Sequence, residues 1–211
     1  MTRKEKGSNV RKTLLLDSKA IVLALILGMV LAIIDIFYLV IMLIFFVLAV
    51  LVTKYRYYDK KSMGVYEHER GWENVFANGF IPLIGALISP GAFIGAVAAV
   101  MSDKFASELG ILGEDPIDLR DFKKTKRGTS GAISLFGTWM SLVGALLIGM
   151  SALLFFEEYN LWSVLLIGGI GFSGSVVDSI FGVFEEKGIG TKMTTNIICA
   201  IIGLILGFLF I

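Results

Sequence analysis

The chain has 211 residues, of which 56% are hydrophobic and 18% are charged, with a mean hydropathy of +0.81 and a net charge of +1. This composition excludes an ordinary soluble enzyme or binding domain and indicates an integral membrane protein. The charge balance gives no reason to expect a nucleic-acid partner. No polar linker divides the chain, so we expect a single membrane domain over residues 1–211.

Apolar runs long enough to cross a lipid bilayer recur along the whole chain. Seven membrane-spanning helices are predicted, at 15–34, 36–53, 74–89, 91–109, 130–156, 161–184 and 193–211. Asp35 is expected to form a turn between the first two, because one helix over both would be too long. Pro90 and Gly91 predict another turn after the third span. The predicted fold is therefore all-α, a polytopic membrane helix bundle.

Lysine and arginine indicate the orientation of the bundle, because they are enriched in short cytoplasmic loops. They lie before the first span, after the second, around the loop after the fourth and after the sixth. The loops at Asp35, Pro90 and Glu157-Glu158 contain none. We therefore predict a cytoplasmic N-terminus, with an uncleaved first span, and place Ile211 outside. The expected location is the cell membrane.

The third span carries two asparagines, Asn74 and Asn78, one turn apart on the same helix face. Pro82 has no N–H to donate to the carbonyl of Asn78, so this carbonyl and the side-chain amide are available to a ligand. Hydrogen bonding to a neighbouring helix is the alternative interpretation of both residues.

The fourth span has a face of small residues that allows another helix to approach closely and that ends in a carboxylate. This face contains Gly91, Gly95, Ala99, Asp103 and Ser107. Glu108 lies about 140° round the helix from Asp103, so the two share a ligand only if the last turn frays or the ligand is large. Solvation or an ion pair with Lys104 is the alternative for Glu108.

The segment DFKKTKRGTSGAIS, residues 121–134, is a basic loop that is expected to run directly into a helix. Backbone N–H groups at a helix start favour anions, and Lys126 and Arg127 can bind phosphate oxygens. The spacing is not that of a Walker A motif. A cytoplasmic location explains the charges alone, but it does not explain the small residues from Gly128 to Gly131.

The sixth span contains Asp178, about two turns inside an apolar helix, where an ionisable residue is a functional candidate by default. The same face carries Gly171, Ser175, Gly182 and Glu185. A salt bridge within the bundle is the alternative interpretation of Asp178. Asn196 adds a polar group at the same end of the last span. Carboxylates beside phosphate-binding groups indicate Mg²⁺ and transfer of a phosphorylated group to a lipid-soluble substrate.

Five ordered segments resemble the phytyl-phosphate kinase family of tocopherol synthesis and phytol salvage, with its uncharacterised bacterial, archaeal and animal relatives. They are ERGWENVFANG, SDKFASELG, KRGTSGAISLFGT, GFSGSVVDSIFG and the asparagine of TTN, between Glu69 and Asn196. Phe105 stands where the family has tryptophan. Ser130 and Ala132 stand where it has an acid or amide and a glycine.

This resemblance implies transfer of the γ-phosphoryl group of a nucleoside triphosphate, with CTP favoured, to an isoprenyl monophosphate of phytyl or geranylgeranyl type. Asp103 and Asp178 would hold Mg²⁺, with Glu108 as a third ligand or an orienting group. The substrate-binding residues would be Arg70, Asn74, Asn78, Ser107, Lys126, Arg127, Gly128, Thr129, Ser175 and Asn196. The isoprenyl tail is expected in a lateral groove between the small-residue faces.

Two other functions remain open. A cytidylyltransferase that makes a CDP-activated lipid would use similar acids and bases, but it would release pyrophosphate. A transporter of small anions also has acids within the membrane. Against the transporter, the chain has no internal repeat and no polar residue on its outer half comparable to Asp178. The sequence does not indicate the oligomeric state.

Overall fold

The computed structural model describes residues 16–64, 71–114 and 116–211, which form eight helices and one small sheet. The seven long helices are α1 (Ser18–Ile34), α2 (Ile36–Lys54), α4 (Trp72–Ile88), α5 (Pro90–Gly110), α6 (Leu135–Phe155), α7 (Leu161–Glu186) and α8 (Lys192–Phe210). The short elements are α3 (Tyr57–Ser62) and the antiparallel strands β1 (Ile117–Asp118) and β2 (Ala132–Ile133). The predicted all-α bundle with seven long helices is confirmed.

Side chains at the helix starts explain several of these boundaries. Asp35, Ser89, Ser134 and Thr191 each accept a hydrogen bond from a backbone N–H in the first turn of the following helix. Such caps satisfy donors that a helix leaves unpaired. Pro90 then occupies the start of α5, where its missing N–H costs nothing. The predicted turns after the first and third spans are therefore confirmed.

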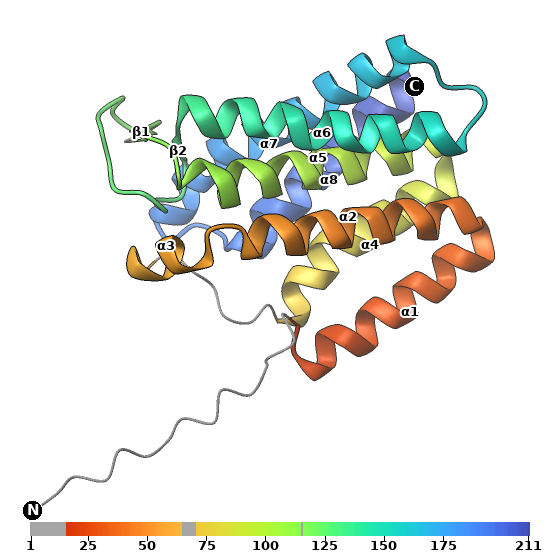
Figure 1. Ribbon diagram of the computed structural model, residues 1–211, viewed down its shortest axis with the longest axis horizontal. Coiled ribbons are helices and arrows are strands. Elements are labelled where there is room, and N and C mark those ends of the chain that lie inside the picture. Colours follow the sequence, from red (N-terminus) through yellow and green to blue (C-terminus); the bar gives the residue numbers. More distant parts are fainter. Residues whose placement is uncertain (1–15, 65–70, 115) are drawn as a thin grey trace, which may run out of the picture.

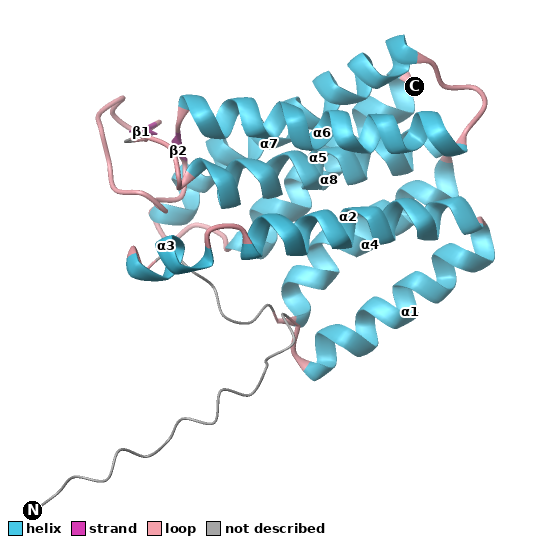
Figure 2. Ribbon diagram, viewed as in Figure 1, coloured by secondary structure: helices cyan, strands magenta, loops and turns pink. Residues whose placement is uncertain are grey.

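The long helices run alternately in opposite directions, so their connections gather at two ends of the bundle (Figure 1, Figure 2). One end, at the left of Figure 1, holds α3, both strands and the turn between α7 and α8. We call it the basic end, because every Lys and Arg in the described part of the chain lies in its loops, in α3 or in the adjoining helix turns. The cytoplasmic orientation of that end stays a prediction.

Four of the described helices, α2, α6, α7 and α8, are long and apolar enough to cross a membrane. The shorter helices α1 and α4 are also apolar and have 17 residues each. α5 is apolar over its first half, but its last turns contain Asp103, Lys104 and Glu108. These polar residues are shielded because α5 lies in the middle of the bundle.

α5 contacts α2, α4, α6, α7 and α8, and its residues 91–102 are all buried. Gly95 lies so close to the backbone of α8 at Gly203 that there is no room for a Cβ atom. The small-residue face predicted in the sequence is therefore a close-packing face. It leaves no groove against α8, so the prediction that an isoprenyl tail lies between the small-residue faces is wrong.

Candidate functional site

Asp178 of α7 is a buried carboxylate that is only partly satisfied. Its Oδ2 accepts a hydrogen bond of 3.0 Å from Nζ of Lys192, the first residue of α8. Its Oδ1 is buried and has no hydrogen-bond partner among the described residues. A buried oxygen without a partner is costly, so it points to a ligand or an ion in the functional state. The salt bridge considered as the alternative is present, but it uses one oxygen only.

Three further side-chain oxygens, Ser102 Oγ, Glu185 Oε2 and Asn196 Oδ1, are buried without a partner within the described ranges. Glu185 lies two turns after Asp178 on α7, and Asn196 lies one turn after Lys192 on α8. Asp103 of α5 acts electrostatically on Lys192 together with Asp178 and Glu185. We call Asp103, Asp178, Glu185, Lys192 and Asn196 the acidic cluster. The side chain of Lys192 is 46% exposed, so the cluster opens toward the basic end.

The acidic cluster contains oxygen donors of the kind that Mg²⁺ accepts. Asp178 and Glu185 offer unpaired carboxylate oxygens, and Mg²⁺ is typically held by one or two carboxylates together with substrate phosphates. However, no three His, Cys, Asp or Glu side chains of the described residues are arranged to hold a metal ion without a substrate. The predicted trio of Asp103, Glu108 and Asp178 is not assembled, because Glu108 belongs to a second cluster.

This second cluster, which we call the lysine cluster, consists of Thr53, Lys60, Lys104 and Glu108. Lys104 Nζ donates to Glu108 Oε1 over 2.6 Å, and Lys60 Nζ donates to Glu108 Oε2 over 2.9 Å. Thr53 donates to the same carboxylate over 3.1 Å. The alternative interpretation of Glu108 as the partner of Lys104 is therefore confirmed.

Lys60 of α3 is completely buried, because its side chain binds backbone carbonyls at the C-terminal end of α2. Its Nζ donates 2.7 and 3.2 Å hydrogen bonds to the carbonyl oxygens of Val52 and Thr53. The last carbonyls of a helix lack partners within the helix, so Lys60 satisfies them while it neutralises Glu108. This arrangement joins α2, α3 and α5 at the basic end.

Asn74 and Asn78 bond each other within α4, since Asn78 Nδ2 donates to Asn74 Oδ1 over 3.0 Å. Both line a largely apolar groove between α1, α2 and α4, and Lys104 and Thr53 line the same groove. The prediction that Asn74 and Asn78 share a face of α4 is confirmed. Asp178 of α7 does not line the groove that they line.

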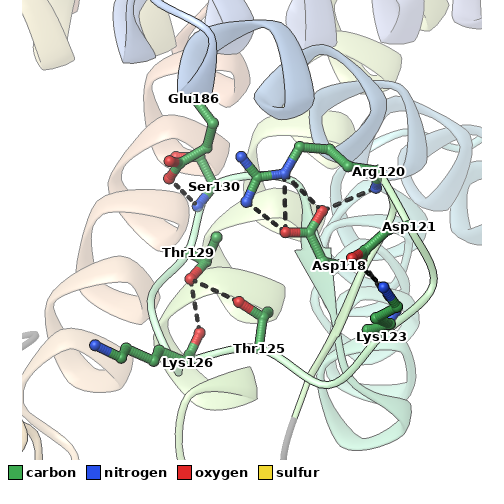
Figure 3. Close-up of polar contacts among 9 residues, drawn as sticks. All are labelled: Asp118, Arg120, Asp121, Lys123, Thr125, Lys126, Thr129, Ser130 and Glu186. Atoms are coloured by element: carbon green, nitrogen blue, oxygen red, sulfur yellow. Dashed lines mark hydrogen bonds and ion pairs between the residues drawn. The ribbon is translucent and has the colours of Figure 1, made fainter.

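The loop between α5 and α6 is held by Asp118 and Arg120 and lies against α7 (Figure 3). Nε and Nη2 of Arg120 donate to the buried Asp118 carboxylate, which lowers the pKa of Asp118 and raises the pKa of Arg120. The backbone N–H of Ser130 donates to Glu186 of α7 over 3.0 Å. Gly131 packs on Gly182, one turn beyond Asp178, with no room for a Cβ on either residue.

The small residues from Gly128 to Gly131 do not start a helix, in contrast to the prediction. Gly128 and Gly131 have φ values of +84° and +75°, which exclude a right-handed helix. Ala132 and Ile133 then pair with β1, and α6 begins only at Leu135. The glycines allow the loop to turn sharply and to pack closely on α7. The loop therefore offers no helix N-terminus to a phosphate, but it lies close to the acidic cluster.

The other predicted site residues have different surroundings. Ser175 is buried one turn before Asp178, whereas Ser107 is exposed and donates to the carbonyl of Lys104. Thr129 donates to the carbonyl of Lys126 and therefore shapes the loop. Arg127 Nη1 lies 3.8 Å from Met63 Sδ, beyond the end of α3. Lys126 is exposed, and Arg70 lies outside the described residues.

Five residues of the acidic and lysine clusters were missing from the predicted site, namely Thr53, Lys60, Lys104, Glu185 and Lys192. Lys192 follows Asp178 by 14 residues, and only the tight turn between α7 and α8 brings the two together. Lys60 lies in a short charged segment that shows no pattern of burial. Glu185 had been placed on the helix face of Asp178 from the sequence, but it was not included in the predicted site.

Among known proteins, an uncharacterized membrane protein of Methanocaldococcus jannaschii is 37% identical to this chain over 210 residues, which cover 95% of this chain and 87% of that protein. Protein PGR of Arabidopsis thaliana is 32% identical over 111 residues, which cover 47% of this chain and 38% of that protein. No solved structure matches. The family described as "Integral membrane protein DUF92" matches residues 8–201, so this chain belongs to the DUF92 family of integral membrane proteins.

Proposed function

We propose that this protein is a membrane-embedded kinase that transfers the γ-phosphoryl group of a nucleoside triphosphate, CTP in our proposal, to an isoprenyl monophosphate. The reaction would depend on Mg²⁺ and take place at the basic end, facing the cytoplasm. The observation that carries the proposal is the set of unpaired buried oxygens on Asp178, Glu185 and Asn196 next to Lys192. The membrane location of the family supports an acceptor that is dissolved in lipid.

In the proposed reaction, an oxygen of the isoprenyl monophosphate forms a bond to the γ-phosphorus of the nucleotide. The bond from this phosphorus to the β,γ-bridging oxygen breaks, and the nucleoside diphosphate leaves with the electron pair. When bound, Mg²⁺ would supply charge neutralisation on the phosphates, which dominates catalysis of phosphoryl transfer. Asp178 and Asp103 would hold it together with Glu185, while Lys192 would bind phosphate oxygens and Asn196 would orient them.

The loop residues Lys126, Arg127, Gly128 and Thr129 would add positive charge and N–H donors for the nucleotide phosphates. Support for this role comes from the contact between Gly131 and Gly182, because it holds the loop one turn from Asp178. Arg127 lies beside Met63, and its long side chain can turn from there toward a nucleotide.

The test is incubation of the purified protein in detergent with geranylgeranyl monophosphate and CTP labelled in the γ-phosphate. We expect labelled geranylgeranyl diphosphate, and we expect excess chelator to abolish its formation. Label from the α-phosphate in the lipid, with release of pyrophosphate, would instead establish a cytidylyltransferase. Absence of any labelled lipid with all four nucleoside triphosphates would refute the proposal, and anion uptake by protein-containing liposomes would then test a transporter.

The proposed orientation is tested separately by reporter fusions in cells. A reporter after Ile211 should be exposed outside the cytoplasm, and one inserted near Glu114, in the loop at the basic end, should be inside. A cytoplasmic signal from both positions would contradict a bundle with an odd number of spans.

A further inference from the structure

The groove between α1, α2 and α4 is apolar along most of its length and polar at one end. Ala24 and Gly28 of α1 and Val50 of α2 contribute to the apolar part. The polar part consists of Thr53, Asn74, Asn78 and Lys104, from three different helices. Thr53 and Lys104 belong to the last turns of α2 and α5, so the polar part lies toward the basic end.

The polar part of the groove adjoins the lysine cluster, because Thr53 and Lys104 belong to both. The ammonium groups of Lys60 and Lys104 share the single carboxylate of Glu108, and all three side chains are largely shielded from solvent. Among the described residues of this cluster, two ammonium groups therefore face one carboxylate. Because a shielded charge attracts an opposite charge strongly, an anionic group is the complement of this end of the groove. The amides of Asn74 and Asn78 add hydrogen-bonding capacity beside it.

The groove is connected to the acidic cluster through α5. Lys104 lines the groove, whereas the preceding residue, Asp103, acts on Lys192 in the acidic cluster. An anion bound at Lys104 would thus lie on the same turn of α5 as a residue that faces the proposed reaction centre. This geometry suits an acceptor whose tail occupies lipid and whose anionic head must reach a nucleotide.

We propose that this groove binds the acceptor as a lipid with one hydrocarbon chain and a terminal phosphate. The chain would lie against α1, α2 and α4, and the phosphate would contact Lys104 and Asn78. This assignment rests on the kinase proposed above for the identity of the lipid. It replaces the small-residue faces of α5 and α8 as the location of the tail, since those faces are closed by backbone contacts.

The test is direct binding of labelled geranylgeranyl monophosphate to the full-length protein in phosphatidylcholine nanodiscs, without nucleotide. Val50→Trp fills the groove, and Val47→Trp is its matched control, because Val47 lies one turn earlier on α2, is 54% exposed and does not line the groove. We expect Val50→Trp to weaken binding about tenfold or more, with Val47→Trp within about twofold of the natural protein.

The phosphate contact is tested by Lys104→Met and by competition. The variant should weaken binding about tenfold, the loss typical of one charge-assisted hydrogen bond. Should this variant fail to fold, competition by geranylgeraniol on the natural protein answers the same question, because the alcohol should compete at least about tenfold more weakly than the monophosphate. Equal competition by the alcohol, or by two-chain phosphatidic acid, would overturn the assignment.

Failure of the groove and failure of the kinase are distinguishable. If Val50→Trp binds and converts the lipid normally, the groove assignment is wrong and the kinase stands. If the natural protein binds geranylgeranyl monophosphate in the groove but never phosphorylates it, the kinase is wrong, and the groove remains a site for a single-chain lipid phosphate.

Discussion

The two sides of α5 differ in packing and in charge. On the side of α7 and α8, glycines bring backbones into contact, and the polar residues near the basic end keep buried oxygens unpaired. On the side of α1, α2 and α4, a groove remains open, while the charged residues beside it are paired with one another. Carboxylates outnumber ammonium groups in the acidic cluster, and the reverse holds in the lysine cluster. Asp103 and Glu108, two carboxylates within two turns of α5, therefore lie in clusters of opposite charge balance.

The largest expected effect of a single change is that of Asp178→Asn on turnover. The amide keeps the size of the side chain but cannot replace a charged metal ligand, so we expect a loss of about two or more orders of magnitude in kcat. The protein should still insert and purify normally. Turnover is measured at saturating CTP and lipid, with the exposed loop variant Asp121→Asn as a control of the same chemistry. A normal kcat for a folded Asp178→Asn protein would return Asp178 to a purely structural role.

The matching change on the other side, Glu108→Gln, should affect stability and spare catalysis. It leaves the buried Lys60 and Lys104 without a carboxylate, which we expect to destabilise the protein by about 3 kcal/mol. Thermal unfolding in detergent measures this, and the exposed Glu157→Gln at the opposite end should have no effect. A collapse of kcat in a stable Glu108→Gln protein would restore Glu108 as a metal ligand and break the contrast between the two clusters.

Close packing of α7 against α5 is tested by replacing two glycines of α7 with alanine, one at a time. A Cβ on Gly174 would lie 2.5 Å from Cβ of Ala99, whereas a Cβ on Gly169 meets nothing within 4 Å. Gly174→Ala should therefore destabilise the bundle by roughly 1–3 kcal/mol, and Gly169→Ala should leave it unchanged or slightly more stable. The melting temperatures of the two variants, compared with that of the natural protein, decide the matter. Equal melting temperatures would show that α7 can move away from α5.

The smallest effect is expected in the loop that lies on α7. Arg120 lowers the pKa of Asp118 in the folded protein, so the charged carboxylate stabilises the fold above the ordinary pKa of aspartate. This contribution is lost as the pH falls through the lowered pKa. Asp118→Asn should thus reduce the melting temperature slightly at neutral pH, and the difference should vanish in acid. A difference that persists or grows in acid would rule out this ion pair as its cause.

The helices were predictable because apolar length, glycine and capping residues act locally. Ser89-Pro90 and Asp35 mark turns through their own side-chain and backbone chemistry, and the glycines of α5 imply close approach whatever the partner helix is. Asp178 was predictable as a candidate for a similar reason, since a carboxylate within an apolar helix needs an explanation.

The partners of the acids were not predictable, because they depend on how distant elements meet. The grouping of Glu108 with Asp103 failed because Lys60, 48 residues away, reaches the same carboxylate from α3. The helix start expected at Gly128 failed because two strands of two residues each, paired across the loop, delay α6 to Leu135. Contacts of this kind involve few residues and leave no periodic pattern in the sequence.

Because Asp103 and Lys104 are consecutive residues of α5, an insertion or deletion within this helix would affect both clusters. One residue added to or removed from the middle of α5 would rotate everything beyond it by about 100°. This one change would turn Asp103 away from Lys192 and would also move Lys104 out of the groove. Substitutions along α5 can be compensated one at a time, but an insertion or deletion between Gly95 and Asp103 would misalign both clusters together. Length variation among descendants of this chain is therefore expected in the loops at either end and not within this helix.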